Sequence, residues 1–195
     1  DSLTHATDSL KVLFRMLRNT SRVCFIDSFR VSKNELFSTY IIGESTGSFY
    51  PSSAFFEDDS EGEVFLPETG QNILYSRMTP QGVFRFYTKF KSFDRWTDET
   101  PVSGLETDGD LRYPFLQNDG VTIYYAASGS ESMGGLDIFV SRYNTATGKY
   151  LKPENIGMPF NSEANDYLYV IDEDNNLGWF ATDRRQPKDT VCVYV

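Results

Sequence analysis

The sequence predicts an all-β protein that is built from repeated four-stranded units and begins with a short helix. Two observations predict it. Phe, Tyr and Trp make up 15% of the 195 residues, and aromatic side chains favour strands. Short runs of alternating apolar residues also recur at a nearly constant spacing, entered through turns rich in Gly, Asn and Asp, which tolerate the left-handed backbone that hairpins require.

The repeated runs occur in pairs that follow one another along the chain. The first members of the pairs are 72–77, 121–128 and 177–184, and the second members are 83–90, 136–143 and 189–195. Corresponding residues are 53 positions apart for Phe86 and Phe139, and 54 apart for Phe139 and Val193, Trp96 and Tyr150, and Tyr113 and Tyr167. The sequence therefore repeats a unit of about 54 residues.

A unit of this length holds four short strands that cannot bury their own face, as in a blade of a β-propeller. We expect repeats at about 21–48, 49–104, 111–162 and 165–195. In the first repeat, 21–31 is predicted as a third strand and 35–43 as a fourth. The predicted fold is a β-propeller-like array of about three four-stranded blades, incomplete at both ends, in which Trp96 and Trp179 are buried between blades.

Residues 1–20 differ from the rest and predict a short amphipathic helix. Apolar residues recur with a period near 3.6, at Leu3, Ala6, Leu10, Leu13, Phe14 and Leu17. Asp residues come early in the segment and Arg residues late, which suits the helix dipole. We expect this helix to pack on the blades of its own chain, and the alternative is a contact site for a separate partner.

Residues 111–184 resemble the WD40-like β-propeller repeats of the TolB-like family, in the versions found in the cell envelope of Gram-negative bacteria. The resemblance rests on Pro114, the Asn-Asp-Gly turn at 118–120, the aromatic strand at 123–126, the Gly-Gly-Leu-Asp-Ile segment at 134–138, and the Pro- and Asn-rich connection at 153–162. It is weaker over 64–104 and absent from the first 20 residues. The resemblance implies a propeller that is periplasmic or associated with the outer membrane.

Charge and hydropathy exclude two classes of partner. The net charge of −10 repels a phosphate backbone, so nucleic acid is not an expected partner. No apolar run approaches the roughly 18 residues that cross a bilayer, so no membrane span is expected. The chain begins at Asp1, which fits either a removed signal peptide or an excised piece. Cys24 and Cys192 lie in strand-like patterns and are expected to be buried thiols, with a disulfide between them as the alternative.

The sequence offers little to a catalytic site. His5 is the single histidine, and the Gly-Glu-Ser-Thr-Gly run at 43–47 lacks the strand-to-helix context of a nucleophile elbow. The acidic run at 172–176 departs from the calcium-loop pattern and is predicted as a hairpin turn. Gly134 and Gly135 are predicted to be structural, with Asp137 accepting hydrogen bonds from nearby amides. No catalytic residue, metal or cofactor is predicted.

Two functions remain open. The first is a non-catalytic module of the bacterial cell envelope that binds an envelope protein or a glycan, as the resemblance implies. Its predicted binding residues are Arg142, Tyr143 and Tyr150, because aromatic and Arg side chains dominate interface energetics; a packing role stays open for each. The alternative is a glycan-active propeller enzyme, similar to a glycoside hydrolase, with two or three carboxylates at the axis.

Overall fold

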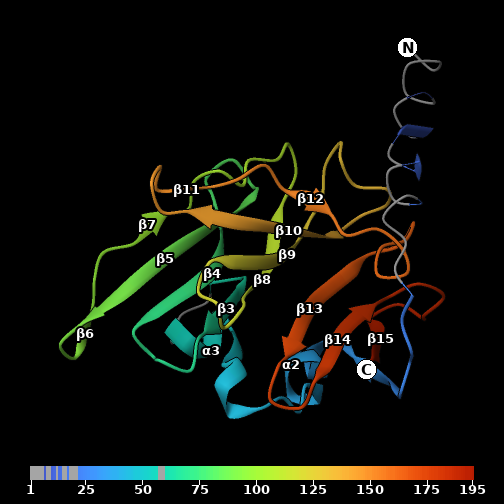
Figure 1. The fold of residues 1–195 in the computed structure, drawn as a ribbon, viewed down its shortest axis with the longest axis horizontal. Helices are drawn as coiled ribbons and strands as arrows, with labels where there is room; N and C mark the ends of the chain where they lie inside the picture. Colours follow the sequence, from blue (N-terminus) through green and yellow to red (C-terminus); the bar gives the residue numbers. More distant parts are fainter. Residues whose placement is uncertain (1–6, 8–9, 12, 15–16, 18–21, 57–59) are drawn as a thin grey trace.

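The computed structural model describes residues 22–56 and 60–195 and, nearer the N-terminus, Thr7, Leu10, Lys11, Leu13, Phe14 and Leu17. Within these residues the protein is all-β, and the strands form three sheets in which every neighbouring pair is antiparallel (Figure 1). The predicted fold class is confirmed at this level.

Each sheet is drawn mainly from one stretch of chain. The first has the order β2-β3-β4-β5-β6, with β7 also paired to β5, and the second has the order β11-β10-β9-β8, with β12 also paired to β10. The third has the order β1-β15-β14-β13. The strands of the first sheet are β2 (Ser48–Pro51), β3 (Glu63–Leu66), β4 (Asn72–Met78), β5 (Phe84–Ser92), β6 (Arg95–Trp96) and β7 (Thr100–Pro101). Those of the second are β8 (Leu111–Leu116), β9 (Thr122–Ala127), β10 (Asp137–Asn144), β11 (Lys149–Tyr150) and β12 (Glu154–Asn155), and those of the third are β1 (Ser28–Ser32), β13 (Asp166–Asp172), β14 (Leu177–Thr182) and β15 (Thr190–Tyr194).

The turns between these strands follow from their residues. Between β8 and β9, Gly120 adopts a φ of 70°, and Asp119 accepts hydrogen bonds from the amides of Val121 and Thr122 at 2.9 and 2.7 Å. Between β13 and β14, Asn176 adopts a φ of 54°. The acidic run at 172–176 is therefore a hairpin turn, as predicted.

The first predicted repeat, 21–48, is not a sheet of its own. Its strand β1 pairs with β15, with Ser28 opposite Tyr194 and Ser32 opposite Thr190, so the partial units expected at the two ends of the chain form one four-stranded sheet. The strand predicted over 35–43 is wrong, because α2 (Leu36–Thr39) is helical. Leu36 and Tyr40 are one helical turn apart, and both are buried in the core.

The remaining helices are short. They are η1 (Lys33–Glu35), η2 (Glu44–Thr46) and α3 (Ser52–Phe56). Among the residues that the structure describes, no helix has the length and apolar character needed to cross a membrane.

Most of the predicted helix at 1–20 lies outside the described residues, as does His5. The described positions of this segment are helical. Leu10, Phe14 and Leu17 are 54%, 66% and 51% exposed. Phe14 nevertheless lines a cleft together with residues of the second sheet, and Leu13 is half-buried, so the expected packing of the whole helix on the chain's own sheets stays a prediction.

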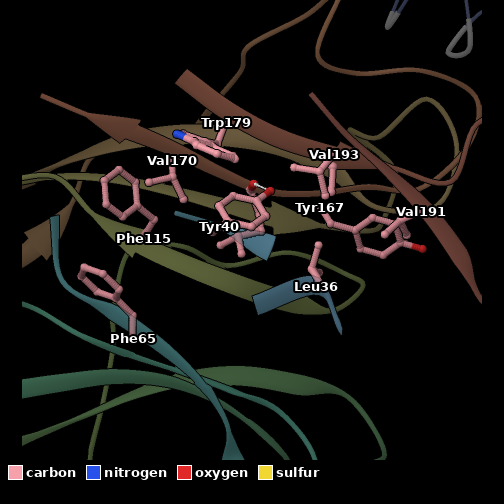
Figure 2. Close-up of a cluster of buried hydrophobic side chains, with 11 residues drawn as sticks. Leu36, Tyr40, Phe65, Phe115, Tyr167, Val170, Trp179, Val191 and Val193 are labelled. Carbon is pink, nitrogen blue, oxygen red and sulfur yellow. Dashed lines mark hydrogen bonds between the residues drawn. The ribbon is translucent and has the colours of Figure 1, made fainter. Parts of the chain in front are cut away.

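The inner strands of the three sheets converge on one hydrophobic core (Figure 2). Phe65 of β3, Phe115 of β8 and Val170 of β13 are fully buried in it. The rings of Phe65 and Phe115 are 5.4 Å apart in a T-shaped arrangement. The second sheet lies between the other two, since β8 contacts β3, β4 and β5 while β13 contacts β8, β9 and β10.

The chain between β1 and β2 completes this core. Tyr40 is buried, with its ring 5.5 Å from that of Trp179, and its hydroxyl donates a 2.6 Å hydrogen bond to the carbonyl of Leu168. Burial raises the pKa of Tyr40 well above its ordinary value. Tyr40 therefore stays a neutral hydrogen-bond donor that ties α2 to the inner strand β13.

The repeat is offset by one residue from the spacing seen in the sequence. Tyr113 in β8 and Leu168 in β13 both have a positive φ, 52° and 29°, at breaks in strand register that follow Arg112 and Tyr167. Tyr113 thus corresponds to Leu168, 55 positions away, and not to Tyr167. Both copies carry the same β-bulge, in which one residue has no partner on the neighbouring strand, and the spacing of the two similar Tyr side chains does not locate it.

Two residue-level expectations hold only in part. Trp179 is 5% exposed and packs in the shared core, but Trp96 is half-buried on the outer face of the first sheet, with its ring 6.2 Å from that of Phe55.

Cys192 is a buried free thiol in β15, as expected, whereas Cys24 is a free thiol that is exposed. Cys24 precedes β1, so no neighbouring strand covers it.

We expect Trp179→Ala to lower the free energy of unfolding by about 3–5 kcal/mol, the usual cost of deleting a buried aromatic side chain. Trp179→Phe should cost less, because it keeps most of the packing and removes an indole N–H that has no hydrogen-bond partner among the described residues. Urea unfolding measures both, with Trp96→Ala as the half-buried control. Equal losses for Trp179→Ala and Trp96→Ala would contradict this account of the core.

Candidate functional site

The three predicted binding residues lie at the outer edge of the second sheet. Tyr143 on β10 pairs with Tyr150 on β11, and their rings are 5.2 Å apart in a T-shaped arrangement. Arg142 is exposed, with its Nη2 3.9 Å from Oδ2 of Asp119. Successive side chains of a strand point to opposite faces, so the structure brings Tyr143 and Tyr150 together and places Arg142 on the other face of the sheet.

Tyr150 also lines an open cleft of about 1360 Å³. Tyr125 of β9 and Phe139 of β10 form the base of the cleft beside it, with their rings stacked 6.0 Å apart. All three belong to, or pack against, a hydrophobic cluster between the first and second sheets. The cleft therefore has an aromatic base, of which the sequence analysis identified only Tyr150 as a binding residue.

One wall of the cleft is the segment that joins β7 to β8. The carbonyl of Ser103 accepts a 3.0 Å hydrogen bond from the amide of Tyr150. Gly104, with a φ of 98°, lies so close that a Cβ there would meet the backbone of Tyr150. Thr107 donates a 2.7 Å hydrogen bond to the carbonyl of Ser128. These contacts hold the wall against both β11 and the loop after β9.

The rim of the cleft is polar and mostly acidic. Carboxylates come from Glu106, Asp108, Glu131 and Glu154, and amines from Lys11 and Lys152. The backbone amide of Ser130 donates a 2.9 Å hydrogen bond to Asp108, and this bond lowers the pKa of Asp108. Asp108 is therefore ionised at neutral pH.

Behind the cleft, Asp137 is a buried carboxylate. It accepts hydrogen bonds from the amide of Met133 at 3.0 Å and from Nδ2 of Asn155, a cleft residue, at 2.8 Å. Burial raises the pKa of Asp137 to about 6, and the nearby charge of Asp166 adds to the increase. The predicted role of Asp137 as an acceptor for nearby amides is confirmed.

The glycines before Asp137 are required by close packing. A Cβ on Gly134 would meet the backbone of Glu163, and a Cβ on Gly135 would meet the side chain of Asn165. Neither glycine is among the residues that line the cleft. The glycine pair is structural, as predicted.

A second cavity, of about 610 Å³, lies at one end of the inner strands and is lined by Lys33, Phe49, Glu63 and Tyr113, among others. Glu63 forms an ion pair with Arg112 and accepts a 2.5 Å hydrogen bond from Ser76. Glu63 is therefore already paired with side chains outside the cavity.

Beside this cavity, Lys33 donates hydrogen bonds to the Tyr167 hydroxyl at 2.8 Å and to Asp183 at 3.1 Å. Tyr167 in turn donates a 2.5 Å bond to Asp183. Burial raises the pKa of Tyr167, and the bond to Asp183 adds to the increase. Tyr167 is therefore a neutral donor in a structural network.

Within the described residues, no group of three or more His, Cys, Asp or Glu side chains could hold a metal ion. In the hairpin turn at 172–176, Asp172 is buried and accepts hydrogen bonds from the amides of Gly43 and Asn175. In the run at 43–47, Ser45 lies in η2, a single 3₁₀ turn between irregular chain and β2. Each segment has a local structural role.

Comparisons of the chain with protein-family models, with curated proteins and with solved structures find no match. The geometry of the cleft and of the inner strands is therefore the basis for assigning a function.

We expect Asp137→Asn to change how stability depends on pH. A carboxyl whose pKa rises from 3.8 to about 6 on folding binds its proton more tightly when folded, so it costs stability above pH 6 and nothing below pH 4. Relative to the parent, the free energy of unfolding of the variant should rise by about 3 kcal/mol between pH 4 and pH 7. Urea unfolding at unit steps of pH measures this.

Asp119→Asn is the control of opposite sign. Partial burial raises the pKa of Asp119, but the hydrogen bonds from Thr122 and Val121 outweigh it and lower the pKa overall. This carboxylate therefore stabilises the fold above pH 4, and its removal should cost stability there. A difference between Asp137→Asn and the parent that does not change with pH would refute the assignment for Asp137.

Proposed function

We propose that the chain is a non-catalytic interaction module of the bacterial cell envelope and that the cleft beside Tyr150 is its binding site. The cleft carries the proposal. Ligand sites are commonly clefts of roughly 300–1,000 Å³ lined by aromatic side chains with a few polar groups. The cleft here is larger, about 1360 Å³, and open, which suits a segment of a glycan chain or of an extended peptide better than a small metabolite.

The chemistry of the cleft supports the same class of ligand. Tyr125, Phe139 and Tyr150 offer ring faces and edges at the base, while Ser128, Ser130 and Ser132 contribute hydroxyls at the loop after β9. Aromatic rings with hydroxyl and carboxylate groups around them suit sugar rings, which have apolar faces and polar edges, and also suit peptides. In this proposal Tyr150 is the binding residue, and Tyr143 lies outside the cleft and does not contact the ligand.

The proposal includes a propeller-like architecture in which the three sheets are three blades. Two observations support it: the inner strands β3, β8 and β13 share one core, and β1 completes the last sheet beside β15. Pairing a strand from near the start of the chain with one from its end closes an otherwise open edge. The location in the cell envelope rests on the resemblance of residues 111–184 to propeller repeats.

The inner carboxylates support a binding role over hydrolysis. Glycoside hydrolysis requires two carboxyl groups that can reach the substrate, roughly 5 to 10 Å apart. Glu63 is paired with Arg112, and Asp166 is buried and accepts a 2.8 Å bond from Arg184. Glu63 therefore links the first sheet to the second, and Asp166 is held within the third sheet.

Titration with soluble ligands tests the proposal. The ¹⁵N-labelled protein would be titrated with peptidoglycan disaccharide-peptides and, separately, with short extended peptides. We expect shifts of the amides of Gly104 and Ser130 and a loss of affinity of about tenfold or more in Tyr150→Ala, the range for an aromatic anchor. Ser130→Trp, which fills the cleft from an exposed loop position, should have the same effect without removing a core contact.

Tyr143→Ala is the matched control, because it removes a tyrosine of the same ring pair that does not line the cleft, and it should bind within about twofold of the parent. Thermal melting of each variant separates loss of fold from loss of binding. Shifts confined to residues outside the cleft would refute the assignment of the site. Turnover of a glycan that disappears in Glu106→Gln or Glu154→Gln would establish the enzymatic alternative.

A further inference from the structure

The hairpin β5–β6 extends beyond the body of the first sheet (Figure 1). Ser92 pairs with Arg95, so Phe93 and Asp94 form a two-residue turn at its tip. Phe93 is 97% exposed and Phe90, on the adjoining strand, is 53% exposed. Two large aromatic side chains are thus presented to solvent at a projecting point of the molecule.

The backbone makes Phe93 an unfavourable choice on structural grounds. Phe93 adopts a φ of 54°, at the first central position of a two-residue hairpin turn, where glycine is the usual residue because a left-handed backbone strains a bulky side chain. The ring gains almost no burial in return. Phe93 therefore strains the backbone and buries almost no apolar surface, so it does not stabilise the fold. This indicates a role in contacting a partner.

The charge of the tip is opposite to that of the whole chain. The net charge is −10, yet at the tip Lys91 and Arg95 flank the single acid Asp94, while Lys89 and Asp98 lie level with each other further from the turn. Lys91 and Arg95 are exposed, lie on the two strands that flank the turn, and form no ion pair within the described residues. Their charges are available to an anionic partner.

We propose that this hairpin tip docks on the surface of a bilayer that contains anionic lipids. Aromatic side chains partition into the interface, while flanking Lys and Arg contact lipid phosphates. The charge of the tip matches such a surface, and the projection of the hairpin keeps the acidic body away from it. A flat surface also accepts a turn with basic residues on both sides, whereas a protein pocket would have to enclose it.

Vesicle binding tests the proposal, and Trp96 serves as the reporter because it pairs with Lys91 at the base of the tip, while Trp179 is buried elsewhere. We expect cosedimentation with vesicles of 70% phosphatidylcholine and 30% phosphatidylglycerol, a blue shift of Trp96 emission, and weaker binding at high salt. Phe93→Gly, which fits the left-handed backbone, should bind about tenfold more weakly without losing stability. Phe93→Trp should bind at least as tightly as the parent.

Charge is tested separately from the ring. Lys91→Glu/Arg95→Glu should weaken binding by more than about tenfold, since each basic residue near an anionic surface contributes about fivefold. Arg185→Glu/Lys188→Glu, two exposed residues of the β14–β15 turn, makes the same change in net charge elsewhere and should leave a residual affinity at least fivefold higher. Met78→Ser controls for the loss of an exposed apolar side chain. Met78 lies at one end of β4, and Phe90 pairs with the residue at the other end of that strand.

Three results would overturn the proposal: no binding by the parent, equal losses in the tip variants and their controls, or equal binding to vesicles of phosphatidylcholine alone. Phe93-dependent capture of an envelope protein without vesicle binding would overturn it in favour of a protein partner. Ligand binding in the cleft is a separate measurement, and Phe93→Gly should leave it unchanged.

Discussion

Packing of Phe65, Phe115 and Val170 in one core fixes where each sheet lies, because each residue comes from the inner strand of a different sheet. With the inner strands held together, the later strands of each sheet lie further out. The chain must then return from β7, beside the outer strand β5, to the inner strand β8. This return segment, 102–110, is the wall of the cleft. The cleft is thus a consequence of how sheets that share a core are connected.

The strands that the sequence predicts correctly carry local signals, namely alternation with a period of two and a turn containing Gly, Asn or Asp. The predictions fail where the decisive contacts are distant in sequence. Nothing within 28–32 indicates that its partner is 190–194. Over 35–43 the alternation suggests a strand, but Leu36 and Tyr40, four residues apart, match one face of a helix. The ring of Tyr40 packs against Phe49 of the first sheet and Trp179 of the third, and the contact with Trp179 is distant in sequence. The one-residue difference in the repeat, 55 positions and not 54 between Tyr113 and Leu168, is visible only from the strand register.

The site was predicted less well than the fold. Tyr150 is predicted from its residue type, yet the cleft is lined by residues of 104–108, 125–132 and 150–155 together with Lys11, Phe14 and Phe139, and only the folded chain brings these together. In the sequence, Phe139 and Tyr125 lie in alternating runs that predict strands, and nothing near them indicates a binding site. Trp96 lies in a strand-like repeat, which predicts burial, although the residue is half-buried on the outer face of the first sheet. The exposure of Phe93 is not predicted from the sequence, because its two-residue turn, Phe93-Asp94, contains no glycine that would indicate a turn.

The pairing of β1 with β15 also has a mechanical consequence. Ser28 lies opposite Tyr194, so tension applied through the chain at these two residues acts at the same end of one strand pair. Hydrogen bonds in an antiparallel pair lie perpendicular to the strands, and such a load reaches them one after another. The hydrogen bonds between β1 and β15 would therefore break sequentially, which requires a low force, while the core shared by the inner strands stays packed. The third sheet would thus release its outer strand β1 under tension, and the first and second sheets would keep all their strands.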